Sequence, residues 1–109
     1  MQREVKQMDA SEFGRFSDPV LFILASLAGG EKHGYAMMED IEISTGVHLG
    51  PGTLYGALSR LEQVGYIKAL PTDDRRRPYR LTTKGATFLR QYLASLKKFV
   101  SLGLKRLEA

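Results

Sequence analysis

The chain has 109 residues, of which 43% are hydrophobic and 26% are charged, as in one ordinary globular domain. It contains no cysteine, which excludes disulfides, a thiolate nucleophile and cysteine-ligated metal sites. Its longest apolar stretch covers about ten residues, whereas a membrane span needs ~20, and its first residues include Glu4 and Asp9 but no apolar run. We therefore expect a soluble cytoplasmic protein with no membrane segment, metal or cofactor.

The charge is distributed unevenly along the chain. The net charge is +4, but residues 1–74 carry six Lys/Arg against eleven Asp/Glu, whereas residues 75–109 carry ten Lys/Arg against one Glu. This asymmetry favours a polyanionic partner that contacts part of the molecule. A solvated helix face accounts well for Lys97, Lys98, Lys105 and Arg106, but less well for three consecutive arginines in a predicted turn.

The amino-terminal third begins with a polar segment and continues into an apolar helix. Residues 1–16 are predicted to be an N-terminal arm with a short helix as far as Glu12. Ser17-Asp18-Pro19 combines a capping oxygen with a first-turn proline, which is typical of a helix start. The helix that follows is apolar almost all round and stops at Gly29-Gly30, so we predict that it is the buried central helix.

A second helix is predicted from His33-Gly34 to about Ser44, with His33 at its terminus. A three-residue spacing assigns its inner face to Tyr35, Met38 and Ile41. Its water-facing residues are then Glu39, Asp40 and Glu42.

A third helix opens at Gly50-Pro51 and ends at Gly65. Leucines at i, i+4 and i+7 form its inward stripe: Leu54, Leu58 and Leu61. The outer side then carries small and polar residues, namely Gly52, Thr53, Gly56, Ser59, Arg60 and Gln63.

Two short runs, residues 66–70 and 78–82, bracket a polar tip that contains Arg75, Arg76 and Arg77, and this pattern predicts a β-hairpin. Thr82-Thr83 is suited to capping a last helix that begins at Lys84.

The last helix has a broad apolar face with an a/d rhythm. That face could pack on the first helix or on a second copy of the chain, and we expect both, with dimerisation favoured. The predicted dimerisation residues are Phe88, Leu89, Tyr92, Leu93, Leu96, Phe99, Val100 and Leu107.

The predicted fold is mainly α with a small β-hairpin: a winged helix-turn-helix over residues 17–83 and a long C-terminal dimerisation helix over 84–109. The motifs are Gly34-Tyr35, a Pro-Gly-Thr-Leu-Tyr run from Pro51 to Tyr55, and a Tyr-Arg-Leu-Thr run from Tyr79 to Thr82. With these motifs the chain resembles the PadR family of winged-helix transcriptional regulators over residues 17–109, and its length is similar to that of the short subgroup.

The resemblance implies a homodimer that binds double-stranded DNA at an inverted-repeat operator and acts as a repressor. It also implies a small aromatic or apolar effector that lowers the affinity for DNA. Some relatives hold flat drugs between tryptophans, and this mode is not carried over because the chain has no tryptophan. Two further departures from the family pattern are Gly50 in place of a serine and Gly56 in place of a proline.

The candidate DNA-binding residues are Tyr35, Pro51, Gly52, Thr53, Tyr55, Ser59, Arg60, Arg75, Arg76 and Arg77. Arg60 is suited to bidentate recognition of guanine. The alternative is that its stem covers apolar surface, or that it pairs with Glu62 or another neighbour. Tyr55 and Tyr35 either contact phosphates or belong to the core.

A second reading is a winged-helix module that docks an acidic protein without binding DNA, which the acidic Asp73 and Asp74 at the hairpin tip keep open. An enzyme is not expected, because no nucleophile–base pair, phosphate loop or metal signature is present.

Overall fold

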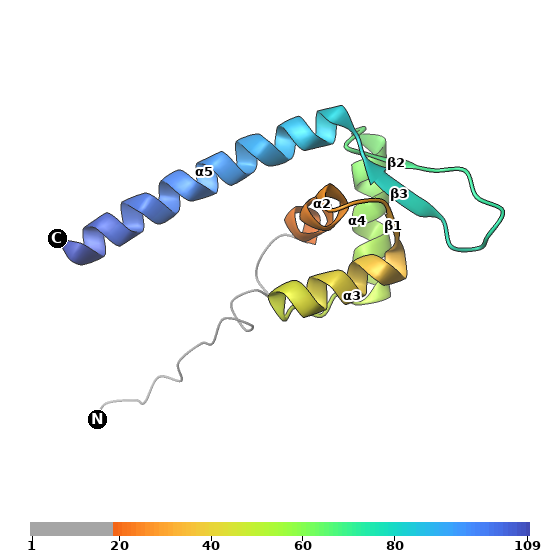
Figure 1. The fold of residues 1–109 in the computed structure, drawn as a ribbon, viewed down its shortest axis with the longest axis horizontal. Coiled ribbons are helices and arrows are strands. Elements are labelled where there is room, and N and C mark those ends of the chain that lie inside the picture. The colour runs from red at the N-terminus through yellow and green to blue at the C-terminus, as the bar shows by residue number, and fades with distance from the viewer. Residues whose placement is uncertain (1–18) are drawn as a thin grey trace, which may run out of the picture.

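The computed structural model describes residues 19–109. The predicted arm over residues 1–16 and the predicted cap at Ser17-Asp18 lie outside the described residues. The elements, in chain order, are α2 (Pro19–Ala28), β1 (Lys32–His33), α3 (Gly34–Thr45), α4 (Pro51–Gln63), β2 (Ile67–Ala69), β3 (Pro78–Leu81) and α5 (Thr83–Glu108) (Figure 1). The mainly helical class, the hairpin and the long last helix are therefore as predicted.

Local capping explains where α3 begins and ends. The backbone N–H of Ala36 donates to Nδ1 of His33, which is the N-cap of α3, at 3.2 Å. The helix ends at Gly46, whose φ of 76° is a left-handed conformation that a residue without a Cβ adopts readily.

The ends of α4 follow the same rules. Pro51 occupies its first turn, and Gly50 before it makes no side-chain cap, as predicted from its lack of a side chain. At the other end Gly65 has a φ of 80°, and the N–H of Tyr66 donates to the carbonyl of Leu61 at 3.0 Å. This 6→1 hydrogen bond closes a Schellman motif, which satisfies carbonyls that the helix end would leave without partners.

The sheet has three antiparallel strands in the order β1-β3-β2. Ile67 faces Leu81 and Ala69 faces Tyr79 in the hairpin, while Lys32 of β1 faces Tyr79 from the other side. The strand β1 is an addition to the predicted fold. It ties the connection between α2 and α3 to the base of the wing, the hairpin formed by β2 and β3 with its loop at residues 70–77.

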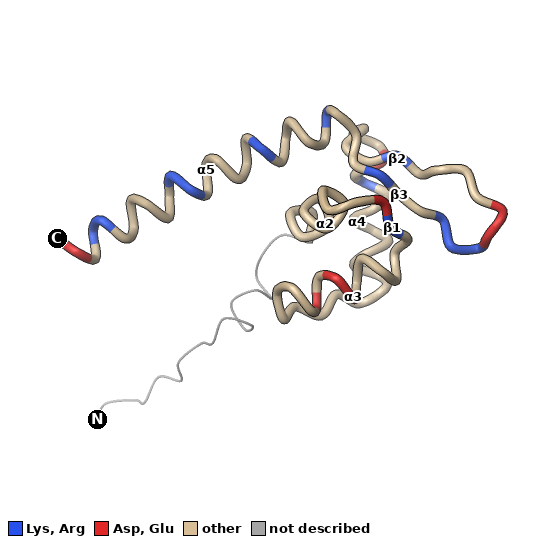
Figure 2. The backbone as a smooth tube through the Cα atoms, viewed as in Figure 1, with Lys and Arg blue, Asp and Glu red and all other residues tan. Residues whose placement is uncertain are grey.

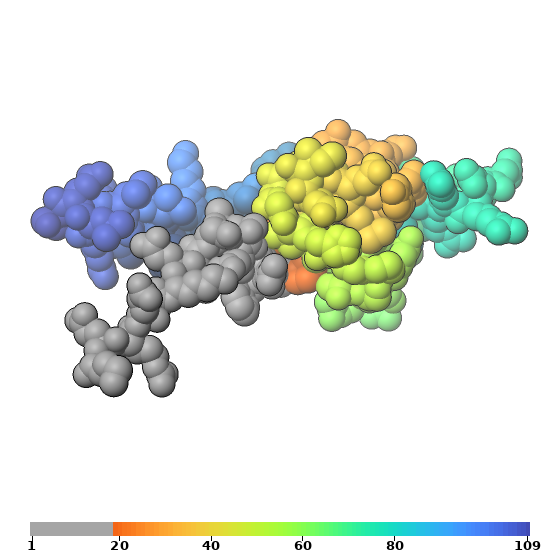
Figure 3. All heavy atoms as spheres, turned by 90° about the horizontal axis from the view of Figure 1, so that it is seen from below, coloured from red at the N-terminus to blue at the C-terminus, as the bar shows by residue number. Residues whose placement is uncertain are grey.

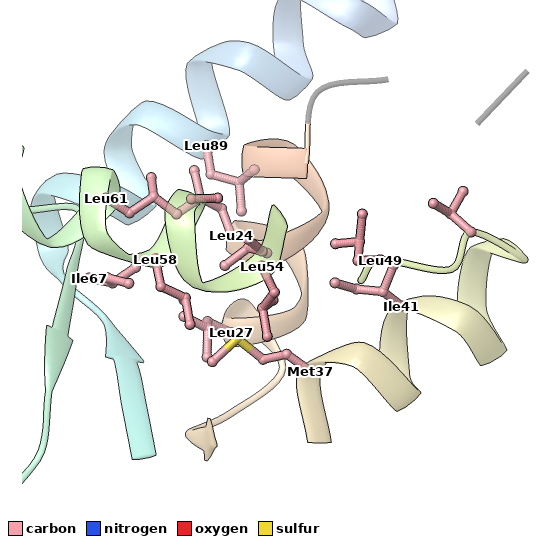
Figure 4. Close-up of a cluster of buried hydrophobic side chains, with 13 residues drawn as sticks. Leu24, Leu27, Met37, Ile41, Leu49, Leu54, Leu58, Leu61, Ile67 and Leu89 are labelled. Carbon is pink, nitrogen blue, oxygen red and sulfur yellow. The ribbon is translucent and has the colours of Figure 1, made fainter. Parts of the chain in front are cut away.

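The core is built around α2, which contacts α3, α4, α5 and β3, so the prediction of a buried central helix is confirmed. Figure 4 shows the cluster. Its members are Ile23, Leu24, Leu27, Met37, Ile41, Val47, Leu49, Leu54, Ala57, Leu58, Leu61, Ile67 and Leu89. The three leucines predicted for the inward stripe of α4 are all buried. Within the described residues no helix is long and apolar enough to cross a membrane.

The predicted inner face of α3 is partly wrong. Tyr35 is 56% exposed, and the buried residues of this helix are Gly34, Met37 and Ile41. The spacing of three placed the stripe one position out of phase at its start, because 3.6 residues per turn require mixed steps of three and four. Asp40 does not simply face water: it is half-buried, and the hydroxyl of Ser26 on α2 donates to its carboxylate at 2.6 Å.

The final helix divides into an attached part and a projecting part. Leu89 is only 5% exposed and lies in the core of its own chain, so its assignment to an exposed dimerisation face is corrected. Phe88 is half-buried and its ring stacks on that of Tyr66 with centroids 4.6 Å apart. From Arg90 onward every residue is exposed, and α5 extends from the helical body on the side opposite the wing (Figures 1 and 3).

Candidate nucleic-acid interface

Residues from four elements meet between the start of α3, the first half of α4 and the wing. A small pocket of about 150 Å³ lies there. It is lined by His33, Gly34, Tyr35, Tyr55, Arg75, Arg76, Arg77 and Tyr79. Five of the predicted DNA-binding residues are therefore brought together although 42 positions separate the first from the last: both tyrosines and all three arginines.

The two tyrosines are surface residues and not core members. Tyr35 is 56% and Tyr55 is 52% exposed. The ring of Tyr55 lies directly on the first turn of α3, because a Cβ built on Gly34 would come within 2.7 Å of the Tyr55 hydroxyl oxygen. The missing side chain of Gly34 therefore allows α3 and α4 to present both phenolic hydroxyls on one surface.

The wing keeps its arginine side chains available. Oγ1 of Thr72 accepts a hydrogen bond from the N–H of Asp74 at 3.0 Å, and Oδ1 of Asp74 accepts one from the N–H of Arg76 at 3.4 Å. Such contacts from short polar side chains to nearby backbone groups are typical of tight turns. Within residues 19–109, no carboxylate forms an ion pair with the wing arginines, which lie beside the two acidic residues at the loop tip (Figure 2).

The outer face of α4 lies beside this pocket and does not line it. Thr53, Ser59 and Arg60 are exposed, as are Pro51 and Gly52 in the first turn. The predicted division of α4 into a buried stripe and an exposed polar stripe is therefore confirmed. Arg60 makes no ion pair with Glu62 or with any other residue of the described part of the chain, so one of the two non-DNA roles considered for it is absent.

The space beyond this face is open. A Cβ built on Gly52 or on Gly56 would meet no atom within 4 Å. At these positions α4 therefore presents backbone and short side chains outward. The major groove of B-DNA is wide enough to admit an α-helix with such a surface.

Three of the residues that line the pocket had not been assigned to the interface: His33, Gly34 and Tyr79. Burial and the nearby carboxylate of Glu62 raise the pKa of Tyr79 above its ordinary value of 10.0, while Arg77 acts in the opposite direction. Tyr79 therefore keeps its hydroxyl proton at neutral pH and can donate a hydrogen bond. The pairing of β1 with β3 brings His33 and Tyr79 to the pocket, and no local pattern in the sequence predicts that pairing.

Within residues 19–109, no three His, Asp or Glu side chains lie close enough to hold a metal ion. The interface is therefore one of hydroxyls, guanidinium groups and an exposed helix face. Three helices, the third bearing an exposed polar stripe, followed by a hairpin with a basic tip, define a winged helix-turn-helix protein.

Within that class the chain belongs to the PadR-like family of transcriptional regulators, whose family model matches residues 23–91. The chain is 31% identical to a transcriptional regulator from Clostridium thermocellum, with a TM-score of 0.71 over 79% of this chain and 86% of that one. It is 27% identical to a PadR family transcription regulator from hypervirulent Clostridium difficile, with a TM-score of 0.65 over 78% of this chain and 96% of that one.

A curated relative is longer. The chain is 40% identical over 84 residues to an uncharacterized 37.1 kDa protein in transposon TN4556 of Streptomyces fradiae. The match covers 77% of this chain but only 24% of that protein, so the chain spans about a quarter of the length of this relative.

Proposed function

We propose that this regulator is a homodimeric, sequence-specific repressor that occludes a promoter by binding an inverted-repeat operator. The observation that carries the proposal is the single surface that combines Tyr35, Tyr55 and the three wing arginines beside the exposed stripe of α4. In this proposal Thr53, Ser59 and Arg60 face base edges in the major groove. The tyrosines, the wing arginines and the first turn of α4 at Pro51 and Gly52 contact phosphates.

The unpartnered apolar face of α5 supports the dimer. Eight large apolar side chains on this helix are between 37% and 84% exposed: Tyr92, Leu93, Leu96, Phe99, Val100, Leu102, Leu104 and Leu107. A contiguous apolar surface of this kind is unusual on a monomer and is typical of an interface. Because a two-fold dimer repeats each recognition helix, its preferred site is an inverted repeat with half-site centres about 10–10.5 bp, or a multiple, apart.

The same face offers a place for the small apolar or aromatic effector. Phe88, Gln91, Tyr92, Ser95 and Leu96 line a hollow of about 440 Å³ on α5. The hollow is open to solvent in one chain, so in this proposal a second α5 helix completes the enclosure of a ligand, as most small-molecule sites require. A ligand held there in the dimer would change how the two α5 helices meet, and so lower the affinity for DNA.

We favour this proposal over the alternative of a protein-docking module, which the two acidic residues at the hairpin tip suggest. One of them, Asp74, accepts a hydrogen bond from the N–H of Arg76 and so has a local role in holding the turn.

The experiment that tests the proposal is a mobility-shift titration with duplex DNA from upstream of the protein's own gene. We expect a specific shift at submicromolar dimer that weakens steeply with salt, because phosphate contacts release counterions. Absence of a shift at low salt and micromolar protein would contradict the proposal. Light scattering on the same sample tests the dimer separately.

A further inference from the structure

The end of the recognition helix α4 is hydrogen-bonded to the start of α5 through side chains of α5 and its N-cap. Nζ of Lys84 donates to the carbonyl oxygen of Val64 at 2.7 Å, across 20 positions of sequence. Oγ1 of Thr82 donates to the carbonyl oxygen of Gly65 at 2.6 Å and accepts from the N–H of Gly85 at 3.0 Å. The carbonyls of Val64 and Gly65, just past the end of α4, therefore receive hydrogen bonds from the first turn of α5 and its cap.

The backbones at this point are also in direct contact. A Cβ built on Gly85 would overlap the carbonyl of Tyr66 and come within 2.9 Å of the Leu81 side chain, so only glycine permits this approach. The ring of Tyr66 is stacked on Phe88, and the ammonium group of Lys84 lies 5.6 Å from the centre of the same ring. We call residues 64–66 together with residues 82–85 the α4–α5 joint.

Lys84 differs from the other members of the joint. Thr82 also caps α5, Gly85 also packs in the interior, and both are needed for the local fold. Lys84 is exposed, and within the described residues its one side-chain hydrogen bond runs from α5 to Val64, the C-cap of α4. A cation at a helix carboxyl end also interacts favourably with the helix dipole.

We propose that Lys84 is a positioning residue that fixes the direction of α4 relative to α5 and thereby selects the spacing of the operator half-sites. The inference rests on the proposed dimer, in which the two α5 helices form the interface and each carries its own α4 through this joint. Lys84 itself does not contact DNA in this proposal, because the joint lies at the opposite end of α4 from its first turn.

Because α4 is long, a small change of angle at the joint produces a large displacement of its first turn. Thirteen residues at 1.5 Å each give a helix about 20 Å long. A tilt of about 10° at the joint moves the first turn of α4 by roughly 3.4 Å, which equals the rise of one base step along a DNA strand. Loss of the Lys84 hydrogen bond should therefore relax discrimination between operators that differ by one base pair in spacing, without changing which bases each half-site prefers.

The first test uses DNA selected from a random pool by the wild-type protein, and versions of that site with one base pair inserted or deleted between the half-sites. The variant Lys84→Met keeps the aliphatic stem but removes the donor, and Lys84→Arg restores one. We expect the ratio of Kd values for altered and selected spacing to fall about two- to tenfold in Lys84→Met, as for one lost hydrogen bond, and to recover in Lys84→Arg. The matched control Lys98→Met removes the same charge from the exposed, distant part of α5 and should keep the wild-type ratio.

The second test needs neither DNA nor the dimer. Because the chain has no cysteine, Thr53→Cys and Ser101→Cys place one spin label on the far end of α4 and one on α5. Diluting labelled with unlabelled chains leaves only the distance within one chain. We expect its distribution to broaden in Lys84→Met and to stay narrow in Lys98→Met, with unchanged helical circular dichroism in both.

The outcomes separate the two proposals. If the wild type selects no pair of spaced half-sites, the proposed function and this inference both fail. If it selects such a pair, and Lys84→Met keeps both the spacing ratio and the narrow distance distribution, only the role of Lys84 is overturned.

Discussion

Removing the three wing arginines tests whether the wing contacts DNA phosphates. The variant Arg75→Ala/Arg76→Ala/Arg77→Ala should fold normally, because all three side chains are exposed and form no ion pair with another residue of the described chain. Surface substitutions of this kind usually change stability by less than about 0.5 kcal/mol. Any large effect on DNA binding therefore reflects lost contacts.

The magnitude follows from counterion release. A dimer carries two wings and so six of these arginines. If each neutralises one phosphate, their loss lowers the slope of log K against log salt by about 5, at ~0.9 for each contact. Between 50 and 200 mM salt, the wild type should then lose about 10³ more affinity than the variant. The slopes are measured by fluorescence anisotropy with one labelled operator at four or more salt concentrations.

The matched control is Lys97→Ala/Lys98→Ala/Lys105→Ala. It removes the same three charges from α5, where blue bands lie along the projecting helix in Figure 2. Its slope should stay close to that of the wild type, since these lysines lie far from the wing. Equal slopes for the two triple variants would refute the reasoning, because the wing would then act through net charge alone.

Three further expectations concern the dimer, base recognition and acid stability. Leu93→Glu/Leu96→Glu should leave helical circular dichroism unchanged, since both side chains are exposed in the single chain. Light scattering should nevertheless show a monomer in place of the dimer, because burying unpaired charges in the interface costs several kcal/mol. A dimer that persists would show that the interface lies elsewhere. If Arg60 reads a guanine, Arg60→Ala should lose ~1–3 kcal/mol of DNA-binding free energy per half-site, and Arg60→Lys should be equally impaired. If Arg60 contacts a phosphate, Arg60→Lys should bind like the wild type. Titrations of DNA with the two variants distinguish these roles. Hydrogen bonding from Ser26 lowers the pKa of Asp40 below its ordinary value of 3.8, so ionised Asp40 stabilises the fold above about pH 4. This contribution is lost as the pH falls through the lowered pKa. The free energy of unfolding in urea should therefore fall less between pH 7 and pH 3 in Asp40→Asn than in the wild type, and identical profiles would contradict the assignment.

Features that depend on local periodicity could be predicted from the sequence. In α4 the leucines at i, i+4 and i+7 point inward, and Thr53, Ser59 and Arg60 are exposed as expected. The helix ends at Gly46 and Gly65 were also predictable, because a left-handed residue after a helix favours glycine.

Features that depend on contacts between distant segments could not be predicted. The strand β1 has two residues, which is too short for any alternation, and it exists because β3 offers it a partner. Its pairing brings His33 and Tyr79 into the candidate interface. The contact of Gly34 with Tyr55 likewise joins two helices, so the composition of either helix alone does not reveal it.

The division of α4 into two faces has a consequence for how this regulator can change its target. Residues such as Leu54 and Leu58 carry the packing, whereas a Cβ added at Gly52 or Gly56 would project into open space. In the proposed interface, substitutions on the outer face should therefore alter which DNA is recognised without an equal loss of folding free energy. If α4 reads DNA as proposed, a library varied at Thr53, Gly56, Ser59 and Arg60 should yield many folded members with new DNA preferences, so the scaffold should be retargetable by selection.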